Sequence, residues 1–85
     1  MVSHYVYIVR CSDNTLYTGY AVDVERRVGV HNQGIGSKYT RGRLPVILEY
    51  YEAFEDKSEA LKREYEIKKF SKDKKEELID VGLSI

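Results

Sequence analysis

Residues 5–32 read YVYIVRCSDNTLYTGYAVDVERRVGVHN, and this stretch decides the fold. Residues 4–11 and 16–21 alternate in pattern and are rich in β-branched and aromatic side chains, as strands are. Asp13 and Asn14 lie between the two segments and are typical turn residues. The stretch therefore predicts a β-hairpin, and a helix follows it.

The length of the hairpin loop decides which side chains share a face of the sheet. A two-residue loop pairs Arg10 with Tyr17 and places Tyr7 and Tyr17 on opposite faces. A three-residue loop, with Asn14 in the left-handed conformation, pairs Tyr7 with Gly19 and brings both tyrosines to one face. We predict the three-residue loop, because asparagine tolerates the left-handed conformation.

The predicted helix after the hairpin separates two adjacent arginines. Asp23 is a suitable N-cap for a helix that extends to about residue 32. At about 100° per residue, Val24 and Val28 mark a buried stripe, and His31 falls between them in angle. Arg27 lies at the edge of this stripe and faces the sheet, whereas Arg26 points toward water. Only one of the two guanidinium groups is therefore expected at a site on the sheet.

The remaining segments follow a simple order. Residues 33–43 are glycine-rich and basic and form a loop too long to be only a connector. We predict a strand over residues 46–51, a helix from Asp56 or Ser58 to about residue 70, and an amphipathic helix from residues 71–72 onward. The predicted element order is β-β-α-β-α-α.

Composition limits the classes of protein that this chain can belong to. Its 85 residues fit one domain spanning 1–85, and no apolar run approaches the roughly 18 residues of a membrane span. No signal-peptide hydrophobic region is present, and the lone cysteine, Cys11, reads as structural. We therefore expect a cytoplasmic protein without a membrane partner. The net charge is zero, but residues 1–48 carry +3 and residues 49–85 carry −3, so a nucleic acid is expected on the N-terminal half.

Glu64 is the most informative residue outside the opening stretch. By helical angle it lies near the middle of an apolar face formed by Ala60, Leu61, Tyr65 and Ile67. A carboxylate is costly to bury there unless a cation or donor meets it. Such a residue pairs with an arginine or binds a metal ion, and the alternative is an acid at the rim of the core that reaches water or Arg27. A lone acid would suit a Mg²⁺ ion that keeps most of its waters.

Four further residues have both a chemical and a structural interpretation. Tyr7 and Tyr17 are either half-buried strand residues or phenols that position or deprotonate a water. Arg27 either binds phosphate oxygens or pairs with Asp23 four residues earlier. His31 is either a proton carrier or phosphate contact, or a histidine favoured by the C-terminal end of the helix dipole.

The basic loop is a candidate nucleic-acid contact. Lys38, Arg41 and Arg43 could grip a phosphate backbone, and Tyr39 could stack on a base. The alternative is a solvated basic loop. The Lys- and Glu-rich C-terminal helix is interpreted as a solvated face. Together with the tyrosines, arginine and acid, the loop describes a phosphodiester site without a serine triad or a histidine–cysteine metal cluster.

At this point the sequence resembles the GIY-YIG nuclease superfamily, over essentially the whole chain. Tyr5-Val6-Tyr7 stands where GIY stands, and Tyr17-Thr18-Gly19 stands where YIG stands. The helix with Arg27 and His31, the segment 38–41 and Glu64 complete the pattern in order. The similarity is closest to the short stand-alone bacterial group called YhbQ/YazA-like. Tyr5 departs from the pattern, because it replaces the first glycine of GIY.

The resemblance implies an α+β fold with a small, mostly antiparallel three-stranded sheet flanked by helices. It implies that Tyr7 and Tyr17 flank the nucleophilic water, Arg27 stabilises the scissile phosphate and His31 assists. It also implies that Glu64 holds one divalent ion, Mg²⁺ or another such as Mn²⁺.

The function expected from this resemblance is that of a monomeric endonuclease acting on DNA in repair or processing. It would hydrolyse phosphodiester bonds by one-metal water attack. The alternative is a non-catalytic module that binds DNA or a repair protein on the same scaffold. An accessory protein that binds RNA is a third hypothesis, and it rests only on the basic loop.

Overall fold

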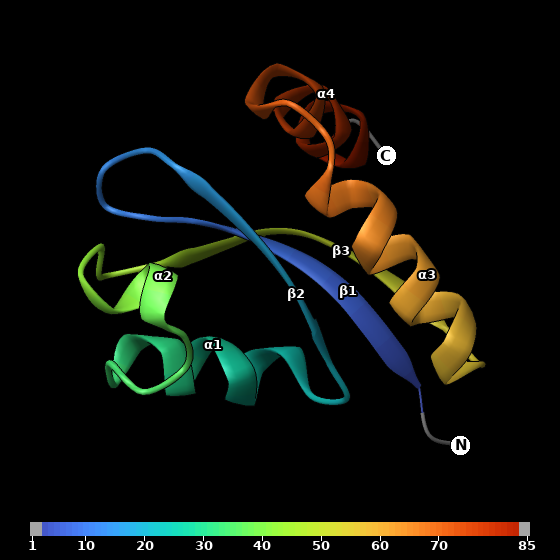
Figure 1. The fold of residues 1–85 in the computed structure, drawn as a ribbon, viewed down its shortest axis with the longest axis horizontal. Coiled ribbons are helices and arrows are strands. Elements are labelled where there is room, and N and C mark those ends of the chain that lie inside the picture. The colour runs from blue at the N-terminus through green and yellow to red at the C-terminus, as the bar shows by residue number, and fades with distance from the viewer. Residues whose placement is uncertain (1–2, 84–85) are drawn as a thin grey trace.

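The computed structural model describes residues 3–83, in which three strands form an antiparallel sheet in the order β2-β1-β3 (Figure 1). The strands are β1 (His4–Arg10), β2 (Leu16–Ala21) and β3 (Ile47–Phe54), and the helices are α1 (Val24–Asn32), α2 (Lys38–Arg41), α3 (Lys57–Lys68) and α4 (Lys72–Leu83). The predicted α+β class and three-stranded sheet are confirmed. The third strand is longer than expected, and the short helix α2 interrupts the segment expected to be a loop.

The hairpin has the predicted three-residue loop. Tyr7 pairs with Gly19, and Asn14 has a φ of 71°, in the left-handed region. The Cys11 N–H donates to the Thr15 carbonyl at 2.8 Å and closes the ladder. Asn14 therefore sets the register that places Tyr7 and Tyr17 on the same face.

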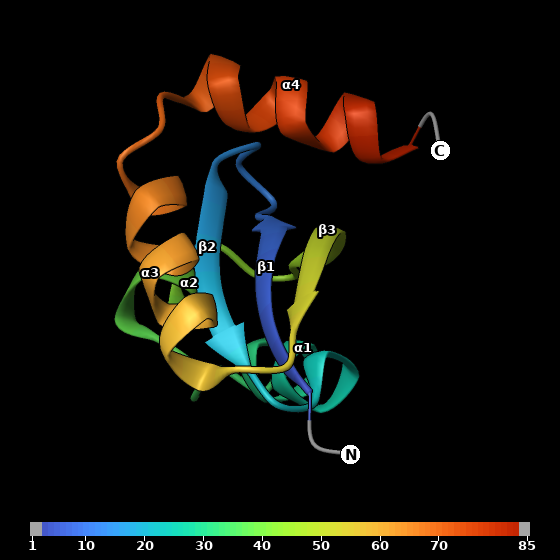
Figure 2. The ribbon, with the colours of Figure 1, turned by 90° about the vertical axis from the view of Figure 1, so that its right-hand side faces the viewer.

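Helices cover both faces of the sheet (Figures 1 and 2). On one face, Val6, Ile8 and Leu16 pack with residues of α3 and α4. On the other, Tyr7, Val9 and Cys11 pack with Val24 of α1 and Val46. β2 lies at the sheet edge, where α3 contacts it, so residues from both layers can approach one another around this edge (Figure 2).

An ion-pair network attaches α4 to the end of β1. Arg10 donates to both carboxylate oxygens of Glu76, at 2.8 and 2.6 Å, and to Glu49 at 2.9 Å. The hydrogen bonds from Arg10, and then from Lys72, lower the pKa of Glu76 to about 2. The C-terminal helix thus depends on a charge at the start of the chain.

We expect Glu76→Gln to lower the free energy of unfolding at pH 7 by about 1 kcal/mol, because the bidentate pair is lost. The folded pKa of Glu76 lies below its usual value, so the pair stabilises the fold above that value and the stabilisation is lost as the pH falls toward 2. Urea denaturation at several pH values should therefore show the difference from wild type narrowing below pH ~4.5. Glu77→Gln, an exposed change on the same helix, is the control, and an equal loss there would contradict the assignment.

Candidate active site

Tyr7 is buried, with 1% of its surface exposed, and its ring lies against Gly19 of β2. A Cβ atom at Gly19 would lie 2.4 Å from the Tyr7 hydroxyl oxygen. A side chain at this position would overlap the phenol, so the glycine opposite Tyr7 makes room for its ring.

The Tyr7 hydroxyl begins a buried chain of hydrogen-bonding groups. Its oxygen lies 2.7 Å from His31 Nε2, and His31 Nδ1 lies 2.9 Å from Thr40 Oγ1. His31 and Thr40 are both fully buried. Gly36 packs so closely on His31 that a Cβ there would lie 2.8 Å from the histidine Cα. Tyr7, Thr40 and Gly36 therefore fix the orientation of the imidazole, with Nε2 beside the Tyr7 hydroxyl.

We expect Gly19→Ala to destabilise the fold by about 1–3 kcal/mol, because the added methyl group forces the Tyr7 phenol out of its place. The matched change is Gly29→Ala on α1, where an added Cβ meets nothing within 4 Å. That substitution should stabilise the fold by roughly 0.5–1 kcal/mol, as alanine does inside a helix. Urea denaturation of both variants gives the comparison. Similar stabilities for the two would show that Tyr7 does not need the space at Gly19.

Burial sets the protonation of the Tyr7–His31 pair. Burial raises the pKa of Tyr7 to about 12, which interactions with Arg27 partly offset. Burial, and then the Arg27 charge, lower the pKa of His31. At neutral pH the phenol is therefore protonated and the imidazole is neutral, so one ring nitrogen can accept a proton while the other donates.

This arrangement gives a pH dependence of stability. Because the folded pKa of His31 lies below that of the unfolded chain, near 6.5, the unfolded state binds more protons as the pH falls. We expect the free energy of unfolding to be highest above pH ~6.5 and to decrease between pH ~6.5 and ~5. In His31→Gln this slope should be absent, whereas His4→Gln should keep it. An unchanged slope in His31→Gln would contradict this account.

Tyr17 lies on the other side of the same histidine. Its ring meets that of His31 edge-on, with centroids 5.3 Å apart, and the Tyr7 ring does the same at 5.9 Å. The predicted placement of Tyr7 and Tyr17 on one face is confirmed. Tyr17 also stacks on Tyr39 of α2, with centroids 5.7 Å apart. Tyr7, Tyr17 and His31 thus form one group, which we call the tyrosine cluster.

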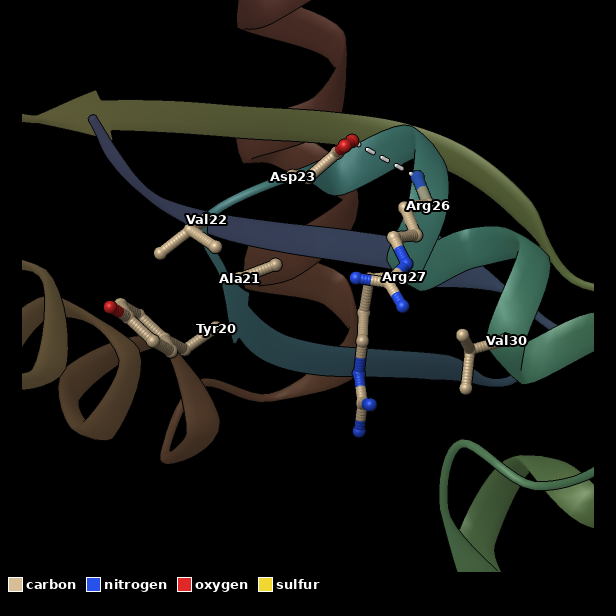
Figure 3. A pocket seen from close by; sticks show the side chains of 7 residues that line it. All are labelled: Tyr20, Ala21, Val22, Asp23, Arg26, Arg27 and Val30. Carbon is tan, nitrogen blue, oxygen red and sulfur yellow. Dashed lines mark hydrogen bonds between the residues drawn. The ribbon is translucent and has the colours of Figure 1, made fainter. Parts of the chain in front are cut away.

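Arg27 is half-buried and fixed by the segment after α1. Its Nη2 donates to the Gly36 carbonyl at 2.8 Å. The pairing of Arg27 with Asp23, considered from the sequence, is replaced by a cap: Asp23 accepts from the Arg26 backbone N–H at 3.1 Å (Figure 3). Arg27 is therefore held toward the tyrosines, as the helical angle predicts.

A pocket of about 300 Å³ opens between the end of β2 and α1 (Figure 3). Arg26 and Arg27 both line it. Arg26 is exposed, as the helical angle predicts, and its side chain also lines this pocket (Figure 3). Two guanidinium groups therefore face one opening beside the tyrosine cluster.

Glu64 lies on α3, which packs on the other face of the sheet and contacts β1 and β2. Its side chain is 18% exposed, Oε2 lies 3.3 Å from Lys68 Nζ, and its charge contributes to the raised pKa of Tyr7. The predicted apolar face is only partly right: Ala60 and Ile67 are buried, but Leu61 and Tyr65 are 40% and 64% exposed. Arg63 also faces inward, where it pairs with Glu52. The less exposed side of α3 is therefore formed by residues 60, 63, 64 and 67.

Glu64 offers a single carboxylate to a cation. The described residues contain no group of three or more His, Cys, Asp or Glu that could enclose a metal ion. The Lys68 ammonium already stands beside the carboxylate as its cation. One carboxylate is enough for a Mg²⁺ ion that keeps its waters and takes the remaining ligands from a phosphate.

This geometry agrees with the comparison to known families. Residues 3–77 match the model of the GIY-YIG catalytic domain. The chain belongs to the GIY-YIG family. Tyr7, Tyr17 and Gly19 are the motif positions of this GIY-YIG domain that meet at its tyrosine cluster. Tyr5, at the first GIY position, packs instead edge-on against Tyr51 of β3, with ring centroids 5.8 Å apart.

Its relatives are of similar length. A UPF0213 protein from Staphylococcus saprophyticus is 61% identical over 96% of this chain and 100% of its own, and one from Haloquadratum walsbyi is 58% identical over 96% and 92%. The solution NMR structure of a UPF0213 protein from Bacillus halodurans has 51% identity and a TM-score of 0.61, over 93% of this chain and 84% of its own. That of a protein from E. faecalis has 42% identity and a TM-score of 0.64, over 95% and 86%. The GIY-YIG domain places the chain in a nuclease superfamily.

The predicted nucleic-acid residues of this GIY-YIG domain divide into two groups. Lys38 and Arg41 are exposed on α2. Arg43 is tied to the fold: it pairs with Asp13 at 3.0 Å, donates to the Tyr39 carbonyl at 2.7 Å and lies 4.2 Å from the centre of the Tyr39 ring. Tyr39 already has Tyr17 and Arg43 as partners. Arg43 and Tyr39 therefore also have structural roles.

Sequence reasoning missed Thr40, the far end of the hydrogen-bonded chain. Ser37 caps α2 by accepting from the Thr40 N–H at 3.2 Å, and this turn buries the Thr40 hydroxyl against His31. The pair Ser37 and Thr40, at N-cap spacing, was the available signal. No helix among residues 3–83 is long and apolar enough to span a membrane.

Proposed function

We propose that this GIY-YIG domain is a metal-dependent endonuclease that hydrolyses DNA phosphodiester bonds with an activated water. The observation that supports this most strongly is the cluster of Tyr7, Tyr17, His31 and Arg27 on one face of the sheet. Glu64 of α3 adds a carboxylate whose charge acts on Tyr7. Such a set combines a proton acceptor, a phosphate ligand and a metal ligand.

Arg27 would bind the scissile phosphate. Its Nη2 is engaged by the Gly36 carbonyl, which fixes the plane of the guanidinium and leaves further N–H donors for non-bridging oxygens. Donors that are fixed before the reaction stabilise the charge that develops on phosphate without reorganising. Arg26, in the adjoining pocket, would contact the strand rather than the reacting phosphate.

The Tyr7–His31 pair would accept the proton of the attacking water. A buried phenol with a pKa of about 12 is a poor source of phenolate at neutral pH. The neutral imidazole removes this difficulty: the water proton passes to the Tyr7 oxygen while the Tyr7 proton passes to His31 Nε2, 2.7 Å away. Tyr17, on the other side of His31, would orient the water.

Glu64 would hold one Mg²⁺ ion. A bound divalent ion supplies Lewis-acid stabilisation of the phosphate oxygens. Lys68 occupies the same carboxylate in the free chain and would be released when Glu64 takes the metal, which adds a cation near the substrate. Together with exposed Lys38 and Arg41 on α2, this makes an anionic strand the fitting substrate class.

The test is a cleavage panel with purified wild-type protein on single-stranded, duplex and branched DNA. Each substrate is incubated with Mg²⁺ and, separately, with chelator. The proposal expects nicked product from at least one substrate, in Mg²⁺ only. Binding in chelator without product in Mg²⁺ on any substrate would overturn it in favour of a non-catalytic binding module.

A further inference from the structure

A second concentration of charge lies outside the candidate active site. Residues 68–75 contain five lysines (Lys68, Lys69, Lys72, Lys74 and Lys75) and one acid, Asp73, for a balance of +4. We call these five lysines the lysine cluster. It stands out because residues 49–85 as a whole carry −3. The cluster lies at the turn from α3 to α4.

A pocket of about 230 Å³ lies beside the lysine cluster. Lys72 and Lys75 line it together with Phe70, with Thr15 and Leu16 at the start of β2, and with Tyr39 of α2. Residues from three separate parts of the chain therefore line this small basic pocket, which we call the recess. Its size suits a phosphate group rather than a larger organic ligand.

The lysines of the recess carry more positive charge than the acidic residues beside it can neutralise. Glu76 pairs with Lys72 at 2.9 Å, but both of its oxygens are also held by Arg10. Lys75 is half-buried, and its burial, followed by the charge of Lys68, lowers its pKa. An anion placed between these ammonium groups would relieve their mutual repulsion.

Aromatic rings hold two more cations near the recess. Lys74 lies 4.3 Å from the centre of the Phe70 ring, and Arg43 lies 4.2 Å from that of Tyr39. Arg43 is also paired with Asp13, whereas the contact of Lys74 with the Phe70 ring does not neutralise the lysine charge. The recess thus has the fixed positive charge that attracts a polyanion.

β2 connects this recess to the candidate active site. Thr15 and Leu16 line the recess, Ala21 and Val22 line the arginine pocket of Figure 3, and Tyr17 and Gly19 lie between them. At about 3.3 Å per residue, the six-residue separation is roughly 20 Å. This is about the axial rise of six nucleotide steps in one strand of duplex DNA, at about 3.4 Å per step.

We propose that Lys72 and Lys75 form a subsite for a backbone phosphate of the DNA strand, outside the phosphate that is cleaved. The inference rests on the proposed function in one respect, that DNA is the substrate. The subsite fixes the strand along β2, with the scissile phosphate at Arg27 and a flanking phosphate at the lysine cluster. It also assigns a function to the C-terminal half of the chain.

The test measures binding in chelator, so that it does not depend on cleavage. Fluorescence anisotropy with labelled single-stranded DNA compares wild type with Lys72→Gln/Lys75→Gln. The control, Lys57→Gln/Lys62→Gln, removes the same charge from two exposed residues of α3 that lie outside the lysine cluster. A third variant, Lys72→Arg/Lys75→Arg, keeps the charge at the recess. Urea denaturation verifies that all variants are folded.

We expect Lys72→Gln/Lys75→Gln to bind about tenfold more weakly near 0.1 M salt, and its slope of log K against log salt to be smaller by about 1.4. The lysine control should bind within about twofold of wild type, and the arginine variant should restore binding. Equal losses in the two glutamine variants, or no loss in either, would overturn the subsite. Wild-type cleavage in Mg²⁺ with unchanged binding by Lys72→Gln/Lys75→Gln would reject the subsite and keep the nuclease. If wild type does not cleave DNA but Lys72→Gln/Lys75→Gln shows the expected loss of binding, the nuclease would be rejected and the subsite kept.

Discussion

Glu64→Gln is expected to lower the rate of Mg²⁺-dependent DNA cleavage by at least about 10³-fold, the equivalent of several kcal/mol of transition-state stabilisation. The amide keeps the size of the carboxylate but removes the charge that would bind a divalent ion. It also removes the partner of Lys68, whose ammonium would then repel any ion at this position. Single-turnover cleavage over a range of Mg²⁺ concentrations measures the effect.

The fold should tolerate this change. The Glu64–Lys68 pair is partly exposed, and such pairs contribute about 0–1 kcal/mol. Glu59→Gln, an exposed change in the first turn of the same helix, is the matched control and should cleave like wild type. Full activity of folded Glu64→Gln would remove the acid from the mechanism.

Arg27→Ala is expected to lower kcat by about 10²–10³-fold, the usual effect of losing a fixed donor that stabilises developing charge. Arg27→Lys should recover little, because an ammonium cannot both keep the Gly36 contact and bind a phosphate bidentately. Steady-state kinetics on the best substrate of the panel separates kcat from KM.

Arg26→Ala is the informative comparison, since both arginines line the same pocket. It should raise KM and change kcat little, because Arg26 would contact the strand but not the reacting phosphate. If Arg26→Ala lowered kcat as much as Arg27→Ala, the two guanidinium groups would not have the separate roles that their positions suggest.

The central part of the site could be predicted from the sequence because its geometry follows from local rules. Asn14 permits a three-residue loop, that loop fixes the register, and the register places Tyr7 and Tyr17 on one face. Asp23 fixes the start of α1, and helical spacing then brings Arg27 to the sheet. Short-range chemistry was sufficient for these residues.

Other parts depend on tertiary contacts that no local pattern contains. Ser37 caps α2 locally, but the burial of the Thr40 hydroxyl against His31, nine residues away, is a tertiary contact. The inward position of Arg63 likewise depends on its pair with Glu52, eleven residues away. The composition of the C-terminal helix predicts a solvated face, whereas the fold brings Lys72 and Lys75 to a recess that Leu16 of β2 also lines.

The most direct test of the central claim is a crystal structure of the Tyr17→Phe variant with a short DNA and Mn²⁺, in which anomalous scattering locates the metal. We expect one Mn²⁺ bound by a Glu64 oxygen and a DNA phosphate oxygen, with the Arg27 guanidinium and the Tyr7 hydroxyl around the same phosphate. Metal bound away from Glu64, or a strand that does not contact Arg27, would contradict the account.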